Sequence, residues 1–132
     1  MTTRRRLAVF AFGIVSALLA SAAPAGAASQ NFTQEAFAAA QKAGKPIIVH
    51  VYAPWCPTCR AQEPAMQRVE SDPNYAGVAM FRVDFDSQKN ALKTLKANRQ
   101  STIIVFKGDK EVGRSVGVTD PGAISALAAK AL

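Results

Sequence analysis

The sequence is poor in the residues that metal centres and disulfide-rich domains require. Its 132 residues include two cysteines, Cys56 and Cys59, and one histidine, His50. Because a zinc site takes three or four ligands and no second Cys-x-x-Cys is present, a metal held by one chain is disfavoured, although two chains could share one. A purely structural disulfide is also disfavoured, since closing so short a loop removes little chain entropy.

Long runs of one charge are also missing. The formal net charge is +7, but Arg4 to Arg6 supply part of it, and the basic residues from Lys42 to Lys130 are scattered singly. Nucleic-acid binding usually needs a basic cluster, so a solvated basic surface is the simpler interpretation. With 49% hydrophobic residues, the chain can form one packed domain but not two independent ones.

No apolar run reaches the roughly 20 residues that span a bilayer. The longest, "LAVFAFGIVSALLA" (7–20), follows three arginines and precedes the small residues Ala25-Gly26-Ala27. This pattern predicts a signal peptide over residues 1–28, cleaved near Ala27 or Ala28, although an uncleaved anchor is an alternative. We expect a periplasmic or secreted protein in an oxidising compartment, where a cysteine pair can form a disulfide.

The remaining domain, residues 29–132, alternates helical and strand patterns. Strand–helix–strand units pair in parallel with a right-handed crossover, whereas a hairpin at Gly108-Asp109 adds an antiparallel edge. The sequence therefore predicts an α/β fold with a mixed sheet and helices on both faces. Thr33, Ser87 and Asp120 are expected helix caps. The expected helices cover 33–44, 57–69, 88–98 and 121–131, and the expected strands cover 47–53, 79–85, 102–107 and 110–116.

The cysteine pair stands where a strand gives way to a helix. Cys56 follows the 47–53 strand, and Pro57 suits the first helical position. The sulfur of Cys56 should meet the free N–H groups and the positive dipole of the helix start, which lowers its pKa below the usual value of about 8.5. Cys59, one turn later, should be less exposed and less acidic. Cys56 is therefore the expected attacking thiolate and Cys59 the resolving thiol.

The stretch "IIVHVYAPWCPTCRAQEP" (47–64), followed by "FRVDFD" and "STIIVFKGDKEVGRSVG", resembles a secreted member of the thioredoxin superfamily. The resemblance covers nearly all of the chain after the signal peptide. It implies a thioredoxin-like fold, thiol:disulfide oxidoreductase activity on cysteine-containing substrate proteins, and no dissociable cofactor. It also implies that Cys56 is the nucleophile, that Cys59 resolves the mixed disulfide, and that Trp55 shapes the docking surface. Pro57 and Thr58, between the cysteines, would tune the redox potential.

Three departures from the family pattern concern the site and the sheet. His50 replaces a buried aspartate, and is either a hydrogen-bonded core residue or a proton acceptor for Cys59. Ser101 replaces a cis-proline, so a trans peptide is expected at Gln100-Ser101, with a hydroxyl available to the Cys56 thiolate. Thr102, the next residue, is a further candidate supporting residue. The segment before the first helix lacks an apolar run, so we expect a minimal four-stranded sheet.

The sequence thus favours an exported monomer that exchanges electrons with protein cysteine pairs, and it favours a reductase over an oxidase. Its redox partner would be a membrane electron donor or acceptor. A metal-handling or non-catalytic thioredoxin-fold binding protein is the alternative.

Overall fold

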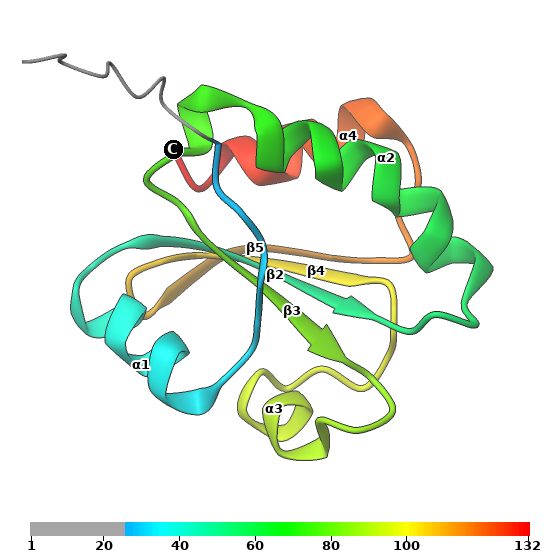
Figure 1. Cartoon of the computed structure of the whole chain (residues 1–132), viewed down its shortest axis with the longest axis horizontal. Coiled ribbons are helices and arrows are strands. Elements are labelled where there is room, and N and C mark those ends of the chain that lie inside the picture. Colours follow the sequence, from blue (N-terminus) through cyan, green and yellow to red (C-terminus); the bar gives the residue numbers. More distant parts are fainter. Residues whose placement is uncertain (1–25) are drawn as a thin grey trace, which may run out of the picture.

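The chain folds around a central sheet with helices on both faces (Figure 1). The computed structural model describes residues 26–132, so most of the predicted signal peptide lies outside the described residues. The strands are β1 (Gln30–Asn31), β2 (Pro46–Tyr52), β3 (Ala79–Asp84), β4 (Thr102–Lys107) and β5 (Lys110–Val116). The helices are α1 (Gln34–Lys42), α2 (Pro57–Ser71), the short 3-10 helix η1 (Pro73–Tyr75), α3 (Lys89–Thr94) and α4 (Pro121–Ala129).

The sheet is mixed, as the sequence predicted. Its strand order is β1-β3-β2-β4-β5. β2 pairs in parallel with β3 and antiparallel with β4, and β5 forms an antiparallel edge beside β4. Gly108, with φ of +60°, lies in the two-residue turn of this closing hairpin and takes a conformation that glycine adopts without steric cost.

The expected strand number was wrong by one. Gln30 and Asn31 form a two-residue fifth strand, β1, in parallel register with Phe81 and Arg82 of β3. Both residues are polar and exposed. Strand pairing uses the backbone N–H and C=O groups, so it does not require the apolar run whose absence led to the four-strand expectation.

Most helix starts are capped as expected. The Thr33 hydroxyl accepts a bond from the Ala36 N–H, and the Asp120 carboxylate accepts one from the Ala123 N–H. The expected Ser87 cap is wrong. Helix α3 begins after Gln88, and the Ser87 hydroxyl instead donates to the Asp84 carboxylate at 2.8 Å.

Two separate hydrophobic cores lie on opposite faces of the sheet. The α2/α4 core includes Ile48, Met66 and Ile124, and the α1/α3 core includes Val49 and Phe81. Consecutive residues of β2 enter opposite cores because side chains alternate across a strand. His50, on β2, points to the same side as Ile48, and it is 2% exposed. In the described part of the chain, no helix is both long enough and apolar enough to span a bilayer.

The topology brings two distant loops together at one end of the sheet, where β2 ends and β4 begins. β2 ends at Tyr52, and the chain reaches α2 within five residues. β4 begins at Thr102, which lies opposite Val51 of β2 in antiparallel register. The Ser101 N–H donates to the Val51 carbonyl at 2.9 Å, which fixes the start of β4 beside the start of α2.

Candidate active site

The cysteine pair forms the first turn of α2. Cys56 is the N-cap residue, and its Sγ accepts a hydrogen bond from the Cys59 N–H at 3.2 Å. Both cysteines are free thiols and nearly inaccessible, with 3% and 0% exposure. The sulfur of Cys56 therefore occupies the place where a capping oxygen usually satisfies the unpaired N–H groups of a helix.

A serine hydroxyl lies between the two sulfurs. Ser101 Oγ is 3.2 Å from Cys56 Sγ and 3.1 Å from Cys59 Sγ. Ser101 has a φ of +60°, and no cis peptide occurs in residues 26–132, so the expected trans bond at Gln100-Ser101 is confirmed. A hydroxyl carries one hydrogen, so it donates to one sulfur while it accepts from the other.

The electrostatics decide which sulfur accepts. Burial opposes ionisation of Cys56, but hydrogen bonds from Cys59, the Ser101 hydroxyl and the backbone of Thr58 outweigh it and lower the Cys56 pKa. Burial raises the pKa of Cys59, and the neighbouring Cys56 adds to the effect. The Ser101 hydroxyl therefore donates to Cys56 Sγ, the more acidic sulfur, and its oxygen faces the Cys59 thiol. The sequence predicted this order of acidity, and the roles of attacking and resolving thiol stay a prediction.

His50 reaches the site through a glutamine that the sequence analysis missed. Its Nε2 lies 2.9 Å from Gln62 Oε1. Since an amide oxygen can only accept, Nε2 carries the proton and donates it. The amide nitrogen of Gln62 donates to the carbonyls of Ser101 at 3.1 Å and Val118 at 2.8 Å. Gln62 is completely buried on α2, and these bonds use both its N–H groups and its oxygen.

The other ring nitrogen of His50 faces a surface ion pair. Nδ1 lies 3.9 Å from Glu63 Oε1, and the same oxygen pairs with the guanidinium of Arg82. Burial lowers the pKa of His50 and Arg82 acts in the same direction, while the bond to Gln62 and the Glu63 charge oppose them. The imidazole is thus neutral near pH 7, and its Nε2–H donates a hydrogen bond to Gln62 rather than to a sulfur.

The remaining candidate residues surround the dithiol at different depths. Trp55 is 54% exposed, and its indole N–H donates to the Asp86 carboxylate at 2.8 Å. This bond holds a large apolar ring at the surface next to Cys56. Pro57 and Thr58 occupy the first turn of α2 between the cysteines. The Thr102 hydroxyl does not join the sulfurs, because it donates to the Arg99 carbonyl at 2.7 Å.

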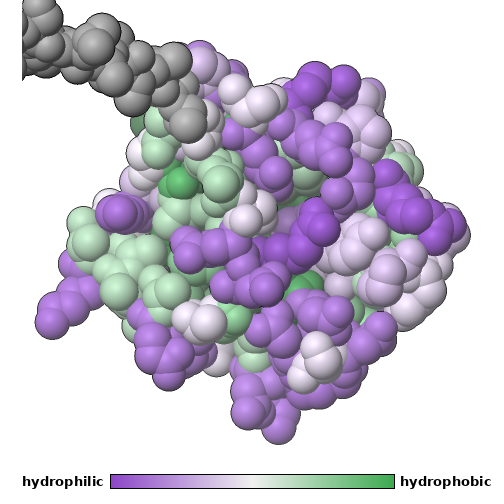
Figure 2. Space-filling model, in the orientation of Figure 1, coloured by the Kyte–Doolittle hydropathy of each residue, from purple (hydrophilic) through white to green (hydrophobic). Residues whose placement is uncertain are grey.

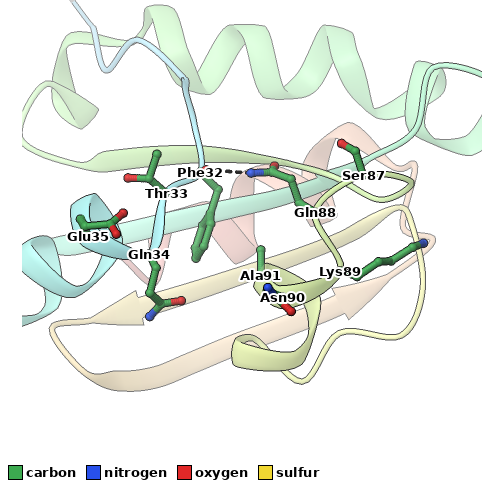
Figure 3. A pocket seen from close by; sticks show the side chains of 9 residues that line it. All are labelled: Phe32, Thr33, Gln34, Glu35, Ser87, Gln88, Lys89, Asn90 and Ala91. Atoms are coloured by element: carbon green, nitrogen blue, oxygen red, sulfur yellow. Dashed lines mark hydrogen bonds between the residues drawn. The ribbon is translucent and has the colours of Figure 1, made fainter.

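Two surface hollows lie away from this chemistry. Figure 3 shows one of about 330 Å³ between the starts of α1 and α3, where the Gln88 amide bonds the Phe32 carbonyl. Figure 2 shows a largely hydrophilic face with a hydrophobic area beside α1, and alanines of α1 line another hollow of about 420 Å³. Neither includes a cysteine. Within residues 26–132, no three His, Cys, Asp or Glu side chains gather to hold a metal ion.

The sequence of residues 28–130 matches the family model of thioredoxin. The chain belongs to the thioredoxin family. The thioredoxin of Chlamydia trachomatis is 30% identical over 101 residues, which cover 76% of this chain and 96% of that protein. Thioredoxin Asp f 29 of Aspergillus fumigatus is 27% identical over 89 residues, covering 67% of this chain and 81% of that protein. The structure of Trxlp from Edwardsiella tarda is similar with a TM-score of 0.72 at 38% identity, covering 76% of this chain and 98% of that one.

Membership of the thioredoxin family gives this protein its reaction class. It is a thiol:disulfide oxidoreductase that acts on cysteine-containing proteins. Within this thioredoxin, Gln62 is the residue near the site that sequence reasoning passed over. A signal for it existed, because Cys59, Gln62, Met66 and Val69 follow one another at helical spacing on a buried face. A glutamine on such a stripe must find hydrogen-bond partners.

Proposed function

We propose that this thioredoxin-family protein is an exported protein-disulfide reductase whose redox centre is Cys56-Pro57-Thr58-Cys59. The observation that carries the proposal is the Cys56 sulfur, which caps α2 and accepts hydrogen bonds from the Cys59 N–H and the Ser101 hydroxyl. Such surroundings lower the pKa of the thiol and favour the thiolate, and the thiolate is the form that attacks disulfides.

The reaction follows from the order of ionisation. The Cys56 thiolate attacks one sulfur of a partner disulfide, forms a mixed disulfide and releases one partner thiolate. Cys59 then gives its proton to the released partner thiolate or to solvent, and its thiolate attacks Cys56 Sγ. This step closes the Cys56–Cys59 disulfide and releases the second partner thiolate. Two electrons have passed to the partner, and a second dithiol protein must return them before the next cycle.

The direction of electron flow is the finer part of the proposal. The described elements form a thioredoxin domain without an inserted helical domain of the kind found in periplasmic oxidases, which favours a reductase. In an oxidising compartment such a reductase needs a supply of electrons from the cytoplasm, so we propose a membrane protein as its donor. We further propose that the protein acts as a monomer, with Trp55 at the surface that substrates contact.

Disulfide exchange and partner trapping test this function. The wild type should reduce insulin disulfides, whereas Cys56→Ser should be inactive. Cys59→Ala should accumulate mixed disulfides through Cys56, because the resolving thiol is missing, and these complexes should disappear on reduction. Identification of the trapped proteins would name the donor and the substrates. An inactive wild type that retains near-stoichiometric metal would replace the reductase proposal with the metal-handling alternative.

Export is proposed from the sequence, with cleavage expected near Ala27 or Ala28, and the contacts of Gly26 and Ala27 support an alternative cleavage point. Ala27 is 5% exposed and packs in the α2/α4 core. A Cβ on Gly26 would lie 2.0 Å from the Glu70 carbonyl oxygen, so the chain passes close to the end of α2 there. Cleavage after Ala27 or Ala28 would remove these contacts. We therefore propose cleavage after Ala25, where Ala23 and Ala25 also satisfy the small-x-small rule. N-terminal sequencing of the exported protein should begin at Gly26.

A further inference from the structure

The Ser101 hydroxyl reaches both sulfurs only because the backbone of Ser101 is held in an unusual conformation. Its φ of +60° lies in the left-handed region, which residues with a Cβ rarely adopt. Such a conformation persists when surrounding contacts over-determine it. The contacts that hold the Ser101 backbone therefore determine where its hydroxyl lies.

Three hydrogen bonds to its own backbone N–H and C=O groups hold Ser101 in place. Its N–H donates to the Val51 carbonyl of β2, and its carbonyl accepts the Gly117 N–H, both at 2.9 Å. Its carbonyl also accepts the Gln62 amide at 3.1 Å. The first two bonds join Ser101 to Val51 of β2 and to Gly117, the residue after β5. The third comes from the same helix that carries the cysteines, three residues after Cys59.

Gln62 itself is fixed from two further sides. The Nε2–H of His50 holds the amide oxygen at 2.9 Å, and the Val118 carbonyl holds the second amide hydrogen at 2.8 Å. All three partners are fixed, since His50 is 2% exposed and the other two are backbone carbonyls. The amide thus ties α2 to β2, to the start of β4 and to the loop between β5 and α4.

We propose that Gln62 is the positioning residue of the dithiol site: its amide holds the Ser101 carbonyl relative to α2, and so places the Ser101 hydroxyl between the two sulfurs. This inference rests on the proposed function, in which Cys56 is the nucleophile. Gln62 touches neither sulfur and acts through Ser101. His50 then has a defined role, because it fixes the orientation of the Gln62 amide and does not take a proton from Cys59.

A cycle of variants tests the inference through the titration of Cys56, followed by thiolate absorbance and by the pH dependence of alkylation. Ser101→Ala should raise the Cys56 midpoint by about one pH unit, since a charged group loses a hydrogen bond. Gln62→Met should raise it in the same direction. The double variant should show little further rise, because both changes remove the same bond. Gln67→Met, the same substitution at an exposed position of α2, should titrate as wild type.

Several outcomes would overturn the inference. An unchanged midpoint in Gln62→Met would show that Ser101 keeps its position without the amide. Fully additive shifts in the double variant would show that Gln62 acts independently of the hydroxyl. An equal shift in Gln67→Met would show that the effect is not specific to the buried amide.

A second variant keeps the test valid if Gln62→Met fails to fold. His50→Leu/Gln62→Met removes both partners of the buried bond, so no unpaired imidazole N–H is left, and it should fold better than the single variant. It still lacks the amide that holds Ser101, so its Cys56 midpoint should also rise. The titration needs no substrate. A wild type without exchange activity would therefore remove the proposed function, whereas a wild-type midpoint in both Gln62 variants would remove only the role of Gln62.

Discussion

Removal of the Ser101 hydroxyl is the most direct test of how this site makes a thiolate. In Ser101→Ala the residue keeps its Cβ, and its backbone hydrogen bonds to Val51 and Gly117 remain. Only the oxygen that lies 3.2 Å from Cys56 Sγ and 3.1 Å from Cys59 Sγ is lost. The change therefore removes one hydrogen bond to the nucleophile, together with the contact to Cys59.

The expected size follows from the energy of that bond. A hydrogen bond to a charged group contributes about 1.5–3 kcal/mol, and 1.36 kcal/mol corresponds to one pKa unit. The Cys59 N–H still donates to Cys56 at 3.2 Å, so a value at the lower end is expected. The pKa of Cys56 should rise by about one unit, and its reactivity below the midpoint should fall about tenfold.

The assay is the rate of alkylation of Cys56 as a function of pH, with Cys56→Ser as the blank. Ser71→Ala is the matched control, because its hydroxyl bonds carbonyls at the far end of α2 and touches no sulfur. Identical midpoints for Ser101→Ala and the wild type would refute the claim that the hydroxyl stabilises the thiolate.

Three further predictions concern stability. Ser101→Pro, which restores the residue of the family pattern, should lower the free energy of unfolding in urea by more than about 1 kcal/mol, because proline requires φ near −65° and cannot donate to Val51; unchanged stability would show that this segment can adopt another backbone conformation. Burial keeps the folded-state pKa of His50 low, so wild-type stability should fall as the pH drops below about 6.5, by up to ~1.4 kcal/mol per pH unit. His50→Leu should lose this part of the pH dependence, and parallel wild-type and variant curves would contradict it. Gly26→Val should destabilise the fold by about 1–3 kcal/mol through the clash with the Glu70 carbonyl, whereas Ser29→Ala should not, and equal unfolding midpoints would show that the domain does not need this contact.

Much of the fold could be predicted because its signals are local. The β-branched run of β2 and the Asp120-Pro121 start of α4 gave these elements their place, and both are confirmed. The strand β1 could not be predicted in the same way. Gln30 and Asn31 pair through their backbone only because β3 offers a free edge, and this edge exists only in the folded sheet.

The residues of the site also differ in how far the sequence could predict them. The position of Cys56 at a helix start follows from the strand before it and from Pro57 after it, so this position was predictable. The conformation of Ser101 was not predictable, since serine has no preference for positive φ and the constraint comes from residues distant in sequence. The position of Gln62 had a local signal, but its partners come from three separate segments.

The division of the interior by the sheet affects how this protein can change during evolution. Cys56 and Cys59 cluster with Ala53, apart from both larger cores, whereas Phe37 and Phe81 pack in the α1/α3 core. Phe85 packs against both the cysteine cluster and the α1/α3 core, so a substitution there can reach the sulfurs. Lineages can therefore drift beneath α1 and α3, and thermal tolerance can be adjusted there, as long as Phe85 keeps its place beside the cysteines.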